Sequence, residues 1–344
     1  MVSENPTANT TALTHGLTYR WTAAMLRSLR RCLDDRGFVE ILPAILSERY
    51  EPGARHIVAV LGDQALPEIY EEVAGGNLVV VRGIGHYYLP VSHAVEKQLS
   101  LEHLERVYCV APCVRLVMTG EEKTGRHLCT FFQFEIEWRT EDVEEVFILG
   151  EDLLATVAGQ LLADGQLAKD PTAADRLQIL MRRPYPRITF ENAIKAARDG
   201  ASAASPATGP TADLTREEEE RLAQQYDRPF WIWQYPEGVR DSLYRRNSDG
   251  RYDTYDIMLP LGHGELATGG CRPESGAEII RQSTALGRAL HPSYAGWKAR
   301  TGVQSAGFGI GLERLVLFCS GASDISEIIS YHDSGPNTKI LRRE

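Results

Sequence analysis

The sequence predicts an α+β fold, because stretches with helical periodicity and stretches with strand alternation are both present. Apolar residues recur at helical spacing in residues 21–33 and again in residues 143–161. A period of two runs through residues 131–138, and apolar strand-like runs return at residues 229–235 and 255–261. With 344 residues, 43% of them hydrophobic, the chain can bury one large or two ordinary cores.

The first predicted element is a helix whose apolar stripe includes Trp21, Met25 and Leu29. The polar segment before it, residues 1–17, is expected to be a disordered tail. After the helix the chain is expected to turn at Gly37 into a strand over residues 38–46.

Two strands joined by a polar, glycine-containing loop are predicted next, the first beginning at Cys109 and ending at Arg115. Alternation along the second strand separates two faces. The core face comprises Phe132, Phe134, Ile136 and Trp138, and the opposite face comprises Phe131, Gln133, Glu135 and Glu137. An aromatic residue, an amide and two carboxylates are an unusual set for a solvent-facing surface.

A helix capped by Thr140 is predicted to follow, and Thr215 to Glu218 forms a capping box for a later helix. Between them, residues 199–214 are expected to be a flexible insertion, because their first part is rich in Gly, Ala, Ser and Pro. Strands are then expected at residues 229–235, 255–261 and 264–270.

Three glycines at alternate positions, Gly307, Gly309 and Gly311, lead into a helix that carries Arg314. Glycines let a strand approach a bulky ligand, and an arginine behind them can bind phosphate oxygens through two hydrogen bonds. The spacing fits neither a dinucleotide fingerprint nor a Walker loop. The run therefore indicates a nucleotide site of another kind, with simple strand–helix packing as the alternative.

Composition limits the possible functions. The net charge of −10 argues against a broad nucleic-acid-binding surface. The six cysteines include no C-x-x-C pair, which favours buried thiols over disulfides or zinc. No apolar stretch of about 18 residues is evident, so no membrane span is expected. The N-terminus lacks a hydrophobic signal core, so a cytoplasmic location is predicted.

The segments CVAPCVRLVMTGEEKTGRHLCTFFQFEIEW and GFGIGLERLVLF resemble the second and third signature motifs of class II aminoacyl-tRNA synthetases, in their aspartyl/asparaginyl branch. The resemblance covers most of the chain from Tyr19 to Leu341, and RHL (126–128) and GLER (311–314) are its most specific parts. It implies a class II synthetase fold, with an antiparallel sheet flanked by helices, as a single catalytic domain over residues 18–344. The family's first motif would correspond to Tyr19–Pro43 and build a homodimer interface, the alternative being an ordinary surface helix and edge strand.

The resemblance implies an ATP site with magnesium. Arg115 would bind the α-phosphate and Arg314 the γ-phosphate, with adenine stacked between Phe131 and Arg314. The remaining ATP-binding residues would be Arg126, His127, Gly309 and Gly311. Asp256 and Glu265 are the candidate magnesium ligands, and Arg115, Arg314 and Glu265 are the candidate catalytic residues. The alternatives are surface salt bridges for the two arginines and a structural hydrogen bond for His127.

The implied substrate side contains two cations. Lys97 matches a lysine that aspartyl enzymes pair with the substrate carboxylate, and Arg272 matches a second carboxylate-binding cation. Two buried cations predict an acidic substrate, aspartate or a similar dicarboxylic amino acid, because an amide could not compensate both charges. For Lys97 the alternative is an exposed helix lysine. The other implied substrate-binding residues are Glu51, Ser92, Gln133 and Glu135.

The sequence also departs from the family pattern. Val117 and Thr130 replace glutamates, Ala94 replaces a substrate-binding glutamine, and only residues 1–18 precede Tyr19, where the family has an anticodon-binding barrel. We therefore expect no tRNA partner. The chain instead looks like a synthetase-derived asparagine synthetase, in which ammonia or another amine intercepts an aspartyl adenylate to form an amide. The alternatives are aminoacyl transfer to a carrier protein, a small molecule or tRNA, and a non-catalytic paralogue that senses an amino acid.

Overall fold

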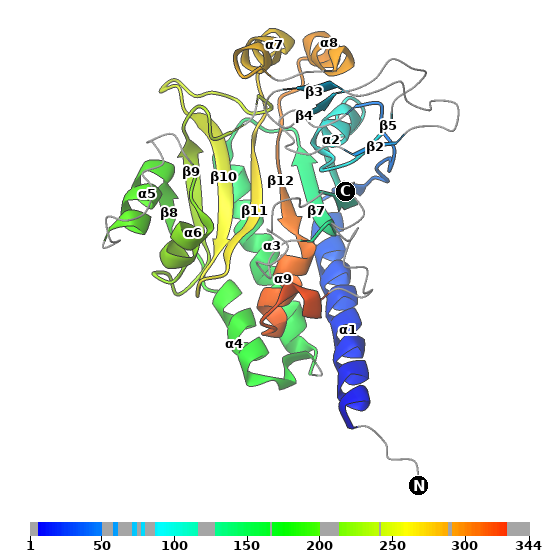
Figure 1. Cartoon of the computed structure of the whole chain (residues 1–344), viewed down its shortest axis with the longest axis vertical. Coiled ribbons are helices and arrows are strands. Elements are labelled where there is room, and N and C mark those ends of the chain that lie inside the picture. The colour runs from blue at the N-terminus through cyan, green and yellow to red at the C-terminus, as the bar shows by residue number, and fades with distance from the viewer. Residues whose placement is uncertain are drawn as a thin grey trace.

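An eight-stranded sheet organises the described part of the chain, in the order β1-β6-β7-β12-β11-β10-β9-β8 (Figure 1). Its strands are β1 (Val39–Glu40), β6 (Arg106–Val114), β7 (Thr130–Trp138), β8 (Arg187–Thr189), β9 (Phe230–Tyr235), β10 (Tyr252–Leu259), β11 (Gly264–Cys271) and β12 (Ala306–Gly311). Neighbours from β6 to β9 are antiparallel, whereas the outer strands β1 and β8 run parallel to β6 and β9. The predicted antiparallel sheet flanked by helices is confirmed, with two parallel pairs at its edges.

The structure is a computed structural model. It describes residues 6–49, 58–60, 71–73, 77–79, 87–115, 128–165, 167–199, 213–240, 242–287 and 291–328.

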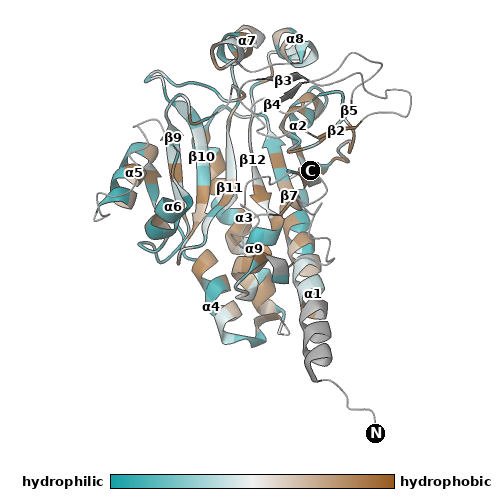
Figure 2. Ribbon diagram, viewed as in Figure 1, coloured by the Kyte–Doolittle hydropathy of each residue, from teal (hydrophilic) through white to brown (hydrophobic). Residues whose placement is uncertain are grey.

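Helices cover both faces of the sheet (Figure 1). They are α1 (Pro6–Asp34), α2 (Ala94–Ser100), α3 (Val143–Ala163), α4 (Pro171–Leu180), α5 (Phe190–Arg198), α6 (Arg216–Ala223), α7 (Gly276–Ala285), α8 (Pro292–Thr301) and α9 (Leu312–Ser320), with short 3₁₀ turns η2 (Leu167–Lys169) and η3 (Ile325–Glu327). Two small two-stranded sheets pair β2 (Val58–Val60) with β5 (Tyr87–Leu89) and β3 (Glu71–Val73) with β4 (Asn77–Val79). Figure 2 shows mostly hydrophobic residues on α3 and α9 and mostly hydrophilic ones on α6.

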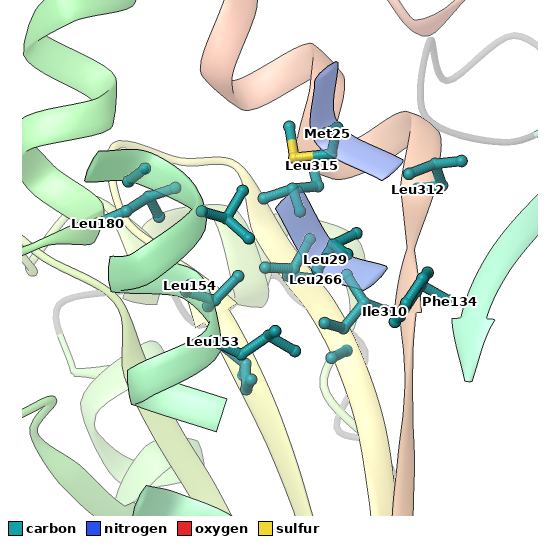
Figure 3. Close-up of a cluster of buried hydrophobic side chains, with 14 of the residues drawn as sticks. Met25, Leu29, Phe134, Leu153, Leu154, Leu180, Leu266, Ile310, Leu312 and Leu315 are labelled. Atoms are coloured by element: carbon teal, nitrogen blue, oxygen red, sulfur yellow. The ribbon is translucent and has the colours of Figure 1, made fainter. Parts of the chain in front are cut away.

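The main core lies between one face of the sheet and α1, α3, α4 and α9. Phe134, Ile136 and Trp138 of β7 are buried there, which confirms the predicted core face. Figure 3 shows Met25 and Leu29 of α1 converging with side chains of the other core elements. Fully burying a side chain such as Leu29 stabilises the fold by roughly 1.5–3 kcal/mol.

The apolar stripe of α1 belongs to this core. Trp21, Met25 and Leu29 are at most 2% exposed within the single chain. A partner subunit is therefore not needed to shield them. The helix begins at Pro6, within residues 1–17, which were expected to be a tail, and the chain then turns at Gly37 with a φ of +75°.

The opposite face of the sheet is covered at its two ends but not by the main core helices. α5 and α6 pack on Phe230, Ile232 and Met258 at the β9–β10 end. α2 packs on β6 and β7 at the other end. The polar face of β7 lies between these coverings.

Of the two predicted helix starts, one is confirmed and one is wrong. Thr215 and Glu218 form the predicted capping box of α6. The cap of α3 is Asp142, which accepts from the amide of Glu144, whereas Thr140 accepts from the amide of Asp142. Thr140 lies too far before the helix to cap it.

The helix α3 corrects a second expectation. Its 21 residues are long and apolar enough to cross a membrane by length and composition, contrary to our expectation that no such stretch was present. However, 61% of the relevant window is buried inside the fold. Burial of this kind is typical of a core helix.

Two further predictions concern the cysteines and the insertion. All six cysteines are free, and five of them are buried, as predicted. Of the expected flexible insertion at residues 199–214, residues 200–212 lie outside the described residues.

Candidate active site

The polar face of β7 meets the glycines of β12 in the middle of the sheet. The register places Glu135 beside Gly309, Gly309 beside Thr268, and Thr268 beside Asp256. This row therefore has a carboxylate at each end, with Gly309 and Thr268 between them. We call Gly307, Gly309 and Gly311 the glycine strip.

Two positions of the strip differ in what lies above them. A Cβ atom at Gly307 would overlap the carboxylate of Glu137 and the carbonyl of Ile136, so only glycine fits. A Cβ atom at Gly309 would lie 3.4 Å from Glu135 Cγ and 3.5 Å from Gln133 Nε2, which are ordinary contacts. Gly307 thus lets Glu137 lie across β12, and Gly309 leaves a flat surface beside Glu135.

Four buried charges lie at one end of the strip. Lys97 Nζ is 2.8 Å from Glu135 Oε2 and 3.8 Å from Glu137 Oε2. Arg272 donates from Nε and Nη2 to the two oxygens of Glu137, at 2.8 and 2.7 Å. The four side chains are at most 3% exposed. We call them the four-charge cluster.

Pairing keeps Lys97 and Glu135 ionised. Burial alone would lower the pKa of Lys97, but the carboxylates of Glu135 and Glu137 more than offset it and the pKa is raised. Burial alone would raise the pKa of Glu135, but Lys97 lowers it below its usual value. The charges of the cluster therefore sum to zero.

This pairing removes the basis of the acidic-substrate prediction. Lys97 and Arg272 do come together as predicted, but each already faces a buried carboxylate. They need no substrate carboxylate for compensation. The sequence placed Glu137 on the correct face, but its pairing with Arg272 depends on residues 135 positions apart.

Two neighbours of Lys97 stabilise α2. Ser92 Oγ accepts from the amide of Ala94 at 3.1 Å, at the start of the helix. Gln98 is fully buried and accepts from the hydroxyl of Tyr294 on α8 at 2.6 Å. Ser92 thus supports the start of α2. Its role as a substrate contact stays a prediction.

The phosphate-binding candidate Arg314 lies on α9. Arg314 Nη1 donates to the backbone and side-chain oxygens of Glu265, at 2.9 and 3.2 Å. The preceding residue, Glu313, accepts from the amide of Phe132 with both oxygens, at 3.0 and 3.1 Å. Burial raises the pKa of Glu313 to about 7. Glu313 thus links α9, the helix of the GLER motif, to β7, the strand that carries Phe131. Sequence reasoning did not predict this contact.

Asp256 is held by two partners that the sequence did not reveal. Tyr235 and Arg240 both donate to Asp256 Oδ2, and the Arg240 guanidinium lies over the Tyr235 ring. Burial raises the pKa of Asp256 to about 6, and nearby Glu265 adds to the increase against the opposing effect of Arg240. No spacing rule links Arg240, in the β9–β10 connection, to this carboxylate.

The donor set is compatible with magnesium. Asp256 Oδ1 is buried without a hydrogen-bond partner in the described part of the chain. Within that part, no three His, Cys, Asp or Glu residues are grouped so as to hold a metal by themselves. Magnesium is commonly bound by one or two carboxylates together with substrate phosphates, which Asp256 and Glu265 could satisfy.

Arg115 directly follows β6 and lies beside Phe131 of β7. Its guanidinium is 5.0 Å from the centre of the Phe131 ring and donates to the carbonyl of Val91. The structure therefore brings Arg115 and Phe131 together. Glu51, Arg126 and His127 lie outside the described residues.

A surface groove of about 790 Å³ lies apart from these residues. Its lining includes Glu102, Arg139, Glu141, Val303 and Gln304, and none of the predicted site residues. The chemistry-bearing side chains line the glycine strip instead.

Comparisons with known proteins identify the family of this chain. A family model described as "tRNA synthetases class II (D, K and N)" matches residues 14–334. An asparagine–tRNA ligase of Herpetosiphon aurantiacus is 27% identical over 72% of this chain and 58% of its own length. One from Nitratidesulfovibrio vulgaris is 28% identical over 71% of this chain and 54% of its own length. The chain thus spans just over half the length of these two relatives.

A solved structure shares the fold. Asparaginyl-tRNA synthetase from Pyrococcus horikoshii, complexed with asparaginyl-adenylate, superposes with a TM-score of 0.76 at 20% identity, over 92% of this chain and 68% of that one. At this identity the likeness concerns the fold.

These findings correct three predictions. The relatives are named as tRNA ligases for asparagine, so the expectation of asparagine synthetase-like amide formation from aspartate and ammonia is wrong. The expectation that tRNA is not a partner is wrong for the same reason, and an acidic substrate is contradicted by these names and by the neutral cluster. With the match over residues 14–334, the eight-stranded sheet and the glycine strip, the chain belongs to the class II tRNA synthetases of the D, K and N group.

Proposed function

We propose that this chain uses ATP to activate asparagine as an aminoacyl adenylate and then transfers the asparaginyl group to tRNA. The neutral four-charge cluster carries this proposal. A substrate carboxylate buried there would leave an uncompensated negative charge, whereas an amide adds none. The asparagine–tRNA ligases that resemble the chain support the same substrate.

The cluster also offers hydrogen bonds of the right kind for an amide. Arg272 Nη1 is buried without a hydrogen-bond partner among the described residues, so it can donate to an amide oxygen. The carboxylates of Glu135 and Glu137 can accept from an amide nitrogen. A side chain that offers one acceptor and two donors therefore complements the cluster.

The chemistry needs positioning more than a protein nucleophile. An oxygen of the substrate α-carboxylate attacks the α-phosphorus of ATP, and pyrophosphate leaves. A hydroxyl at the 3′ end of tRNA then attacks the adenylate carbonyl, and AMP leaves. We assign Arg115 and Arg314 to the phosphates, with Phe131 and the glycine strip supporting the adenylate. Magnesium, held by Asp256 and Glu265, would neutralise phosphate charge when bound.

The decisive experiment is ATP–pyrophosphate exchange with asparagine, aspartate and glutamine, followed by charging of an asparagine-specific tRNA transcript. We expect exchange with asparagine at least about a hundredfold above aspartate, because an unpaired buried charge costs several kcal/mol. Transfer of asparagine to the transcript is expected to follow. Preference for aspartate, or exchange without charging, would overturn the proposal. Absence of exchange with every amino acid would instead favour a sensing paralogue.

We also propose that the chain forms a homodimer through the region around β1. Leu42 is 93% exposed and Ile45 62% exposed, and Val39 and Leu46 are exposed beside them. Neighbouring exposed apolar residues of this kind mark an interaction site. A cytoplasmic location remains a prediction.

A further inference from the structure

The loop from Gly302 to Ser305, between α8 and β12, lies against the four-charge cluster. Ser305 is 1% exposed, and its hydroxyl donates to Glu137 Oε1 at 2.9 Å. Its backbone carbonyl accepts from the amide of Arg272, also at 2.9 Å. Ser305 therefore touches both members of the Arg272–Glu137 pair.

Lys298 holds the same loop from within the fold. Its side chain is buried, and its ammonium donates to the carbonyl of Val303. Burial lowers its pKa to about 8, and Glu137 partly opposes this effect. Burying a lysine ammonium costs free energy, and the hydrogen bond to the carbonyl of Val303 offsets part of that cost.

The outer side of the loop borders the surface groove described above. Gly302, Val303 and Gln304 line the 790 Å³ surface groove, and Val303, 8% exposed, also packs in the apolar cluster that includes Trp297. Gly302 ends α8 with a φ of +61°, which turns the chain toward β12. The packing of Val303, the hydrogen bond from Lys298 and the contacts of Ser305 with the cluster together hold the loop in position.

We propose that Ser305, held in place through Lys298, is a positioning residue that orients Arg272 toward the side chain of the amino-acid substrate. The hydroxyl and Arg272 Nε share Glu137 Oε1, while Arg272 Nη2 binds Oε2. These bonds fix the guanidinium plane and leave Nη1 as the buried donor without a described partner. This inference rests on the proposed function, since it assigns how the substrate side chain is recognised.

The test replaces Ser305 by alanine, with Ser283→Ala as the matched control. Ser283 is also buried, but its hydroxyl donates to Ser242 at 2.9 Å and not to the cluster. Pyrophosphate exchange should show a KM for asparagine raised about tenfold in Ser305→Ala, because a hydrogen bond to a buried charge is lost. The KM for ATP should not change, and Ser283→Ala should behave like the wild type. An unchanged KM for asparagine, or an equal rise in both KM values, overturns the inference.

Two further measurements separate this inference from the proposed function. Lys298→Met should raise the KM for asparagine in the same direction, and Lys298→Arg, which retains a donor, should restore part of it. A crystal structure of Ser305→Ala should show that Arg272 and Glu137 no longer form their two-bond pair, whichever amino acid the wild type uses. A pair identical to that of the wild type would overturn the positioning role even if asparagine is the substrate. Failure of wild-type exchange with asparagine would overturn the proposed function alone.

Discussion

Replacing Glu137 by glutamine tests the charge balance of the cluster directly. The change keeps the size of the side chain but removes one negative charge, so the sum moves from zero to +1. An amide nitrogen would then face Arg272 Nη2, a donor against a donor, where the carboxylate now accepts at 2.7 Å. Lys97 Nζ, 3.8 Å from the same carboxylate, would lose this ion pair and keep the one with Glu135.

The expected loss of stability is large. Removing one partner of a buried pair costs about 3–5 kcal/mol. For a chain of 344 residues, that corresponds to a fall in Tm of roughly 4–7 °C. Thermal unfolding followed by circular dichroism or calorimetry measures it.

Specificity should change in the same variant. A cluster with one excess positive charge can be neutralised by a substrate carboxylate, so aspartate should gain relative to asparagine. We expect the ratio of kcat/KM for aspartate to that for asparagine to rise at least about tenfold, since even part of one charge interaction exceeds 1.4 kcal/mol. Pyrophosphate exchange with both amino acids measures the ratio.

A matched control uses the same chemical change in an exposed pair. Glu102 lies 2.6 Å from Arg300, whose side chain is 62% exposed. Glu102→Gln should therefore leave both the Tm and the substrate ratio close to those of the wild type. The reasoning is refuted if Glu137→Gln melts like the wild type or retains the wild-type substrate ratio.

Three other outcomes are expected. Arg314→Ala should reduce pyrophosphate exchange by about a hundredfold or more, because it removes a phosphate contact and the ion pair with Glu265, and near wild-type exchange would contradict the assignment of the ATP site. Burial raises the pKa of Glu313 to about 7, so the wild type loses stability as pH rises from about 4.5 through 7. Glu313→Gln should lack this loss, gaining roughly 2–3 kcal/mol relative to the wild type between pH 5 and 8 in denaturant titrations, and parallel curves would exclude the effect. Leu42→Asp with Ile45→Asp should convert a dimer into a monomer in light scattering at micromolar concentration, whereas a monomeric wild type would disprove the interface.

Local patterns predicted much of the fold. Alternation in β7 identified its core face, and Thr215 with Glu218 identified a helix start, because both depend on neighbours a few residues away. The cap of α3 was missed by two positions, since Thr140 and Asp142 are both good capping residues and only the path of the chain selects between them.

The sequence by itself determined which residue types face the site: carboxylates on one face of β7, glycines along β12, and Arg272 and Lys97 nearby. Only the tertiary structure decided what those charges face. The register of β7 with β12 and the packing of α2 bring Lys97 to Glu135, and the end of β11 brings Arg272 to Glu137. Because a buried charge must be paired by its nearest neighbours, wherever they lie in the sequence, a motif that suggested two free cations became a neutral cluster once the chain had folded.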